Sequence, residues 1–172
     1  SRSGENANSA LLVQINDSDY GNELFAGLKY QEDLEKKAFK MGDDYKACVQ
    51  LAKDYLENKI SNQFQSVLPT YSIGTTFCDL NDLFSKEVNL ALHEALEHFE
   101  KKVPGFVSGG AILSGVESRS SSSVRLVRDK ESYVSNIQGI YPSGEGSGYA
   151  GGIMTSAIDG IRSAEHLIEY FA

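Results

Sequence analysis

Apolar residues recur every three or four positions in four stretches of the chain, which is the spacing of an amphipathic helix. They predict helices at 23–41, at 46–60, from Ser85 to about 103, and from Ile153 onward. Ser85 is a candidate N-cap, and a glycine or a Pro-Gly pair follows the first and third helices as expected for helix ends. The last helix carries its apolar residues on one face: Ile153, Ala157, Ile161, Ala164, Ile168 and Phe171.

Shorter apolar runs predict strands rather than helices. They lie at 9–16, 111–119 and 124–127, and residues 139–142 read as the last turn of another short strand. Residues 61–76 have no clear period, and we expect an ordered loop whose aromatic residues pack against the domain.

A glycine-rich loop joins the 139–142 segment to the final helix, with glycines at 144, 146, 148, 151 and 152. The order strand, glycine loop, helix is typical of a ligand site, because glycine lets backbone approach a ligand and the first helical N–H groups favour electron-rich atoms. Glu145 lies between two glycines, where its carboxylate could accept hydrogen bonds from sugar or polyol hydroxyls.

Two familiar phosphate-binding motifs do not fit this loop. No lysine follows the glycines as in a P-loop, and their spacing is not that of a Gly-x-Gly-x-x-Gly dinucleotide fingerprint. We therefore interpret the segment as a second loop that covers a cofactor whose main phosphate anchor lies elsewhere. A tight connection without a ligand is the alternative interpretation.

A second polar segment has four consecutive serines, Ser120 to Ser123, between Arg119 and Arg125. Several hydroxyls and two guanidinium groups offer donors to an anionic or carbonyl-bearing ligand. A polar hairpin loop with solvated arginines fits the same residues equally well, so the residues alone leave both interpretations open.

Several segments occur together in the order found in one protein family. They are 19–22, 31–39, 45–47, 68–71, 115–125, Arg128-Asp129 and 139–153. In these segments the chain closely resembles the C-terminal end of a bacterial family of FAD-dependent, NAD(FAD)-utilising dehydrogenases. The family usually has proline where this chain has Ser123, which predicts a looser serine loop here.

The resemblance implies an α+β chain that is a fragment of an α/β flavoprotein. Residues 1–110 would form a mostly helical, substrate-side inserted domain, and residues 111–172 would be the C-terminal return segment of the FAD-binding domain. The FAD-anchoring strand, loop and helix of the family are absent from these residues, so the missing N-terminal part becomes the expected partner. The fragment alone is expected to be inactive.

The resemblance also implies the ligands and their residues. FAD would be bound in the full-length parent, with NAD(P)H as a candidate electron donor and an unknown small molecule as substrate. The implied cofactor-binding residues are Gly144, Glu145, Gly146, Gly148, Gly151, Gly152 and Ile153. The implied substrate-binding residues are Arg119, Ser121, Ser122 and Arg125. Glu145 would bind the ribityl or pyrophosphate region, and the N–H groups near the last three cofactor residues would face the N1–C2=O edge of the flavin.

Composition and charge narrow the remaining classes. A net charge of −8 opposes non-specific nucleic-acid binding. Cys48 and Cys78 have no metal-ligand spacing and are interpreted as reduced structural thiols, while His93 and His98 are interpreted as surface residues and not as metal ligands.

Cellular context follows from what the sequence lacks. No apolar run reaches the roughly 20 residues of a membrane span, and no signal-peptide pattern is present, so we expect a cytoplasmic protein. No residue stands out as a general acid or base, and we assign no catalytic residue. The alternative function is a stand-alone, non-enzymatic binding module, and the length of the native gene distinguishes the two. Sheet edges left unpaired in a fragment could also pair between copies.

Overall fold

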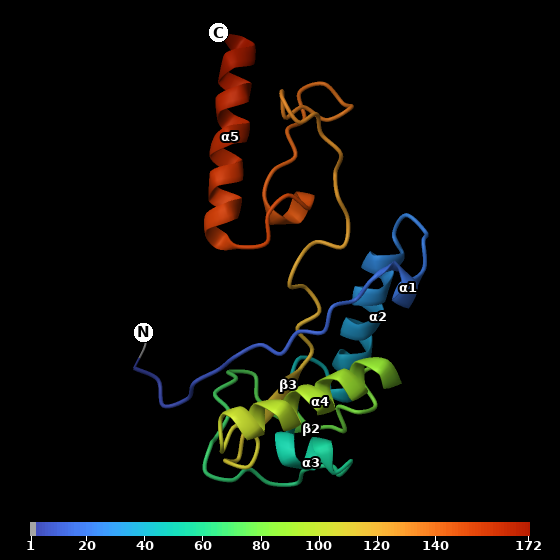
Figure 1. The fold of residues 1–172 in the computed structure, drawn as a ribbon, viewed down its shortest axis with the longest axis vertical. Helices are drawn as coiled ribbons and strands as arrows, with labels where there is room; N and C mark the ends of the chain where they lie inside the picture. Colours follow the sequence, from blue (N-terminus) through green and yellow to red (C-terminus); the bar gives the residue numbers. More distant parts are fainter. Residues whose placement is uncertain (1–2) are drawn as a thin grey trace. The chain divides into compact units, whose positions relative to one another are not determined.

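A computed structural model describes residues 3–172, which form five α-helices, three strands and one 3-10 turn (Figure 1). The mixed α+β class predicted from the sequence is confirmed. The chain divides into two compact units. Unit 1 comprises the residues up to Asn16 together with Glu32–Val116, and unit 2 comprises Asp17–Gln31 together with Glu117–Ala172. None of the helices described here is long and apolar enough to cross a membrane.

Unit 1 is built on a three-stranded sheet with β1 (Ala47–Leu51) in the middle. β2 (Thr75–Phe77) pairs with β1 in parallel, and β3 (Ile112–Gly115) pairs with its other edge antiparallel. From its second residue onward β1 is buried, which is the environment of a central strand covered on both faces.

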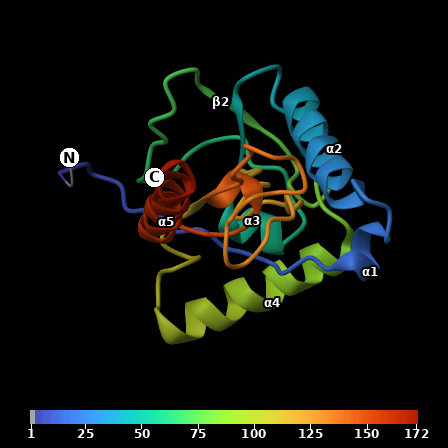
Figure 2. The same cartoon turned by 90° about the horizontal axis from the view of Figure 1, so that it is seen from above.

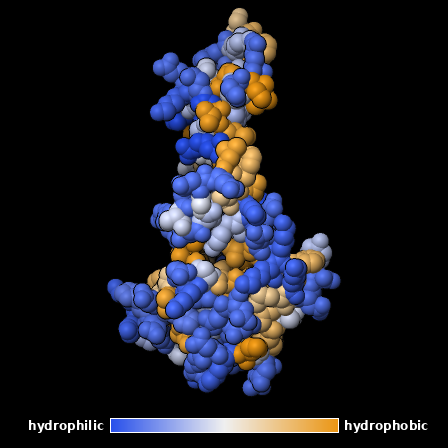
Figure 3. Space-filling view, turned by 90° about the vertical axis from the view of Figure 1, so that its right-hand side faces the viewer, coloured by the Kyte–Doolittle hydropathy of each residue, from blue (hydrophilic) through white to orange (hydrophobic). Residues whose placement is uncertain are grey.

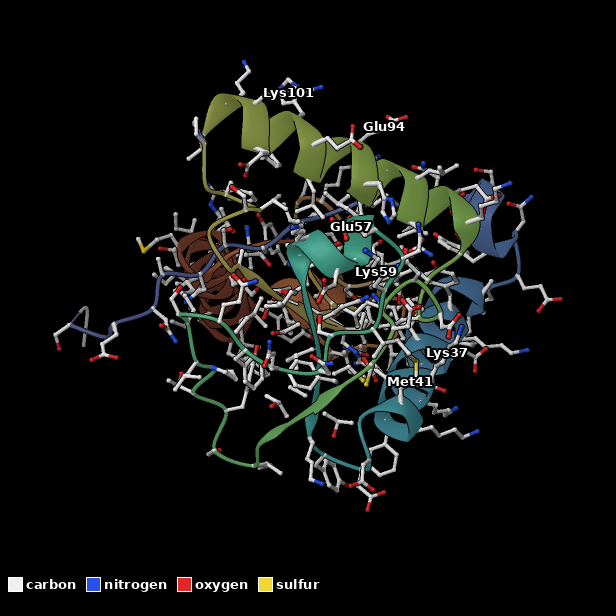
Figure 4. The ribbon with its side chains drawn as sticks, turned by 90° about the horizontal axis from the view of Figure 1, so that it is seen from below. Lys37, Met41, Glu57, Lys59, Glu94 and Lys101 are labelled. Atoms are coloured by element: carbon white, nitrogen blue, oxygen red, sulfur yellow. The ribbon has the colours of Figure 1, made fainter. Side chains whose placement is uncertain are left out.

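Helices close the sheet of unit 1. α3 (Ala52–Leu56) follows β1 directly, and the end of α2 (Ala26–Met41) and the middle of α4 (Lys86–Lys102) pack on the same core. Figure 2 shows α2 and α4 as separate helices around α3. Glu94 and Lys101 point outward from α4, which leaves its apolar face for the core (Figure 4). The buried core consists of Cys48, Ala52, Tyr55, Cys78, Leu80, Leu83, Leu96 and Val107.

The two cysteines contact the C-terminal end of α2. Both are free and buried, as predicted. The thiol of Cys48 donates to the carbonyl of Ala38 at 3.2 Å, and that of Cys78 donates to the carbonyl of Met41 at 3.0 Å. Figure 4 shows Met41 on the last turn of α2. Burial raises the pKa of Cys48 to about 12. The two thiols therefore donate to helix-end carbonyls and have a structural role.

One polar side chain lies in the centre of the sheet. Gln50 is fully buried, and its amide donates to the carbonyl of Lys59 at 2.8 Å while its carbonyl accepts from the N–H of Leu80 at 2.7 Å. It therefore fixes two loops to β1 and meets the rule that buried polar groups are hydrogen-bonded.

The predicted helix at 46–60 is wrong in its first part. Residues 47–51 are the central strand β1, and only Ala52–Leu56 are helical. A strand buried on both faces has apolar residues at nearly every position. When such a strand is followed directly by one helical turn, the combined sequence also has apolar residues at helical spacing and is mistaken for one longer helix. The helix at 23–41 begins later than predicted, at Ala26.

Three predicted strands are also wrong. Residues 9–16, 124–127 and 139–142 are irregular, and in unit 2 the structure records a single isolated bridge between Arg128 and Ser135. An apolar run becomes a strand only when a neighbouring strand supplies ladder hydrogen bonds, which sequence pattern alone does not reveal. The strand predicted at 111–119 is confirmed in its first half by β3, and residues 116–119 are irregular.

Unit 2 contains α1 (Asp17–Tyr20), the 3-10 turn η1 (Glu145–Ser147) and the long helix α5 (Ile153–Phe171). The amide of Gln31 donates to the carbonyl of Ser118 at 3.1 Å and joins the two segments of the unit. The helix predicted from Ile153 onward is confirmed. Among the described residues of this unit, only Gly27, Pro142 and Ser163 are buried, so it has no apolar core of its own.

Candidate cofactor site in unit 2

The glycine loop closes on itself around η1. Gly144 has φ 72° and ψ −163°, and Gly148 has φ 80°, both in regions that favour glycine. The N–H of Gly148 donates to the carbonyl of Glu145 at 2.9 Å, and that of Tyr149 donates to the carbonyl of Gly144 at 3.1 Å. The loop is therefore a hydrogen-bonded turn that leads into α5.

The five glycines fall into two groups, because Gly144 and Gly148 have a positive φ whereas the glycines at 146, 151 and 152 do not. At Gly148 an added Cβ would lie 2.6 Å from the carbonyl oxygen of Val124, so both its φ and its surroundings require glycine. At Gly146 and Gly151 an added Cβ would meet nothing within 4 Å, and at Gly152 it would meet only the Thr155 hydroxyl at 3.7 Å. Neither φ nor neighbouring atoms require glycine at these three positions, and Gly151 and Gly152 leave open space at the start of α5.

The N-terminus of α5 lies at this open space. The cap residue, Gly152, is extended, and no side chain caps the helix. Ile153 is 90% exposed. The first N–H groups of a 19-residue helix carry the positive end of its dipole, so an electron-rich ligand group fits this position. A group that lies flat against bare backbone, such as a flavin ring edge, is compatible with these residues.

The serine-arginine segment lies against the glycine loop. The hydroxyl of Ser122 donates to the carbonyl of Val124 at 2.8 Å and approaches that of Gly146 at 3.4 Å. The guanidinium of Arg125 donates through Nε to the carbonyl of Gly148 at 2.9 Å. The structure therefore brings together two segments that the sequence analysis treated as separate sites.

The other predicted site residues lie at the surface. Arg119 and Ser121 are exposed on the serine loop, and Glu145 is exposed at the start of η1. The carboxylate of Glu145 is thus accessible to a ligand on the glycine loop.

Arg128 and Asp159 connect this loop to α5. The guanidinium makes two hydrogen bonds to the carboxylate, at 2.6 and 3.0 Å, and a third to the carbonyl of Pro142 at 2.6 Å. It lies between two rings, 3.8 Å from the centroid of Tyr149 and 4.0 Å from that of Tyr133. The carboxylate of Asp159 also accepts from the N–H of Gly144 at 2.8 Å.

This ion pair is enclosed, since the two side chains are 7% and 13% exposed. Hydrogen bonding to Arg128 lowers the pKa of Asp159, and the same pair raises the pKa of the arginine. Both groups stay charged, and they hold the start of the glycine loop against the second turn of α5. Asp159 was not among the site residues predicted from the sequence. Its signal was a lone carboxylate in the otherwise uncharged first half of an apolar helix.

Of the two histidines predicted to be surface residues, one is exposed and one is not. His98 is exposed as predicted, but His93 is half-buried, contrary to the prediction. Its Nε2 lies 2.9 Å from the amide oxygen of Asn81, and its ring packs edge-on against Tyr55. Within residues 3–172 no group of three or more His, Cys, Asp or Glu side chains could hold a metal ion.

Unit 1 has a shallow pocket of about 380 Å³ beside His93, lined also by Asn81 and Asn89. These side chains are already used by the fold. Asn89 accepts from the hydroxyl of Tyr55 at 2.7 Å and donates to the carbonyl of Asn81 at 2.7 Å. We assign no ligand to this pocket.

Comparison with known proteins adds two findings. Residues 1–120 match the family model described as "FAD-dependent protein, C-terminal domain-like". The chain is 42% identical over 169 residues to a Clostridium beijerinckii protein described as "Uncharacterized protein", a match that covers 97% of this chain and 32% of the relative. The chain thus spans about a third of the length of that curated relative.

Proposed function

Because the chain belongs to the family of FAD-dependent proteins that this C-terminal domain model describes, we propose that it is the C-terminal portion of an FAD-dependent oxidoreductase. In this proposal the glycine loop and the N-terminus of α5 close over the flavin. The observation that carries it is the open, side-chain-free backbone at Gly151 and Gly152, in front of a helix that no side chain caps.

Each part of the loop has a separate task in this proposal. Glu145 accepts hydrogen bonds from the ribityl or pyrophosphate region. The N–H groups around Gly151, Gly152 and Ile153 stabilise negative charge at the N1–C2=O edge of the ring, as fixed dipoles aimed at developing charge do. A bound flavin would supply the redox chemistry itself.

The substrate side of the proposal rests on the serine loop. Arg119, Ser121, Ser122 and Arg125 bind an anionic or carbonyl-bearing small molecule. Arg125 and Ser122 also hold the glycine loop through its carbonyls, so substrate binding and the flavin-covering loop share residues.

The enzyme class and the division of labour are proposed from the family resemblance. The whole protein is a dehydrogenase with NAD(P)H as electron donor. Residues 1–110 form its substrate-side domain, residues 111–172 complete the FAD-binding domain, and the fragment alone is inactive. The unpaired cysteines agree with a reducing, cytoplasmic location.

The first experiment is a visible absorption spectrum of the purified full-length gene product. We expect the bands of oxidised flavin, and their loss on anaerobic addition of NADH or NADPH. A colourless, folded protein that FAD does not reconstitute would overturn the proposal and favour a non-enzymatic binding module. If flavin bands are present but neither nucleotide bleaches them, FAD stays in the proposal and NAD(P)H is rejected as the electron donor.

A variant series then tests the loop itself. Gly151→Val and Glu145→Gln should weaken FAD binding while circular dichroism stays unchanged. Glu131→Gln is the control, because it removes an exposed carboxylate of the same unit outside the loop. Equal flavin retention in all three variants would reject the site assignment.

A further inference from the structure

Helix α5 turns its polar side toward its own unit. Asp159 binds Arg128, the ring of His166 stacks on Tyr133 with centroids 4.6 Å apart, and the hydroxyl of Tyr170 accepts from Gln138 at 2.8 Å. Ser163, on the same side, is the only buried residue of the helix. Amphipathic helices ordinarily pack with the opposite, apolar side inward.

These contacts fix the rotation of the helix about its axis. They involve positions 159, 166 and 170, which are spread over three turns of one side. The hydroxyls of Ser156 and Ser163 are buried on this side with no hydrogen-bond partner in the described structure. The polar side is therefore held inward by an ion pair, a ring stack and a hydrogen bond, and the apolar side is held outward.

The outward side is the apolar stripe read from the sequence, Ile153 to Phe171. Its large residues are exposed in the structure: Ile153 90%, Ile161 59%, Ile168 67% and Phe171 77%. Ala157 and Ala164 lie exposed between them. A continuous apolar stripe on a helix is rarely left exposed to solvent. Exposed apolar surfaces of this kind usually mark sites where another protein or domain binds.

The rest of unit 2 shows the same deficit. The buried hydrophobic cluster lies entirely in unit 1. In unit 2, Leu126, Val127 and Ile137 are all more than half exposed. Figure 3 shows hydrophobic surface on the side of the 117–152 segment as well. A unit with so little buried apolar surface lacks the main stabilising contribution to a folded domain.

A membrane surface does not fit the stripe. The polar border of α5 carries Arg162, Glu165 and Glu169, whereas helices that lie on anionic lipid are rich in Lys and Arg there.

A further part of the same polypeptide does fit. The family model ends at position 120, but the match to the relative continues beyond it and covers 97% of this chain. About two thirds of the relative lies outside the match. A segment of the same polypeptide meets the stripe at a higher effective concentration than a second copy does.

We propose that the apolar stripe of α5 is the surface on which the FAD-binding remainder of the same polypeptide docks, completing the core that unit 2 lacks. The identity of the docked part rests on the proposed function. The existence of the docking surface rests on the outward orientation of the apolar side of α5, on its exposure and on the missing core of unit 2. Residues of unit 2 and of the remainder then share one core, and the ligand end of α5 is held by the docked body.

Site-specific photo-cross-linking in the purified full-length protein tests this. A benzophenone amino acid is placed in the stripe as Ile168→p-benzoylphenylalanine and, as the matched control, at Arg162 on the polar border of the same helix. We expect the stripe position to cross-link to a peptide outside the 172 residues, and the control position to give at least about tenfold less of that product. Ile161→Cys and Arg162→Cys supply an independent measurement, with maleimide labelling at least about tenfold slower in the stripe.

Every outcome decides the proposal. Cross-links from position 168 to peptides within these 172 residues, including those of a second copy, overturn it, as does equal labelling at 161 and 162. The absorption spectrum of the same samples separates the two proposals. Cross-links to the remainder in a flavin-free protein retain the docking surface and reject the flavin. Flavin bands without such cross-links support the flavin and reject the docking surface.

Discussion

At the scale of single residues, Arg128 has in unit 2 the organising role that apolar side chains have in unit 1. Its guanidinium contacts a carboxylate, a carbonyl and two aromatic rings, and it thereby joins the glycine loop to α5. Arginine suits this position because its planar fork binds a carboxylate through two hydrogen bonds while its faces stack on rings.

Replacement of Arg128 should release the start of the glycine loop. Arg128→Ala leaves the enclosed carboxylate of Asp159 without its cation, which costs about 3 kcal/mol, or roughly a hundredfold in local opening. We expect the Gly144 amide, which donates to Asp159, to exchange its hydrogen faster by about that factor in the full-length protein. Lys130→Ala, which removes an exposed cation of the same unit, is the control. Equal exchange in the two variants would contradict the role of the ion pair.

Glu100 makes a pH-dependent contribution to unit 1. It accepts from the backbone N–H groups of Gly105, Val107 and Ser108 and from the Ser108 hydroxyl. These bonds, with the Ser108 hydroxyl first, lower its pKa from 4.5 to about 2. Because the folded-state pKa is below the unfolded one, the stabilisation is complete above pH 4.5 and is lost as the pH falls toward 2.

Glu100→Gln should therefore flatten the acid side of the stability curve between these two pH values. The measurement is urea unfolding at a series of pH values, with Glu97→Gln, an exposed residue on the same helix, as control. An unchanged slope for Glu100→Gln would show that the carboxylate does not hold the 105–108 turn.

At the scale of elements, the glycine loop separates residues needed by the fold from residues available to a ligand. Gly148 is fixed by a positive φ and by the Val124 carbonyl, while Gly151 meets nothing. Five glycines look alike in the sequence, and only the backbone angles and the neighbouring atoms distinguish them.

This difference predicts opposite effects for one substitution. Gly148→Ala should destabilise the full-length protein by about 1–2 kcal/mol through φ strain and contact with Val124. Gly151→Ala should leave stability unchanged or raise it by about 0.5 kcal/mol, since a compatible backbone gains from a less flexible unfolded chain. Thermal unfolding measures both, and flavin affinity should fall in Gly151→Ala despite the unchanged fold. Similar stability losses in both variants would contradict the conclusion that the fold requires glycine at 148 but not at 151.

At the scale of the whole molecule, the apolar core is confined to one unit. Leu96 is 1% exposed in the core of unit 1, and Leu90 on the same helix is 54% exposed. Leu96→Ala should cost about 3 kcal/mol in urea unfolding, and Leu90→Ala less than about 0.5 kcal/mol. A comparable loss at Leu90 would indicate that its face of α4 is also covered.

The sequence predicted the elements whose signals are local. The α4 and α5 helices follow from apolar spacing, and the side chain of Ser85 caps α4 by accepting from the N–H of Val88, as expected from its position before the apolar run. The mixed class, the free cysteines and the glycine loop before α5 were equally readable, because each depends on residue type and short-range spacing.

Only the tertiary structure decided what depends on partners distant in sequence. β1 is a strand because Thr75–Phe77 and Ile112–Gly115 supply its two hydrogen-bonded neighbours, while the 9–16 run has none in the described structure. Periodicity identified the apolar face of α5 but not its direction. That direction is set by Arg128, 31 positions before Asp159, because an enclosed ion pair forms only where both charges can meet.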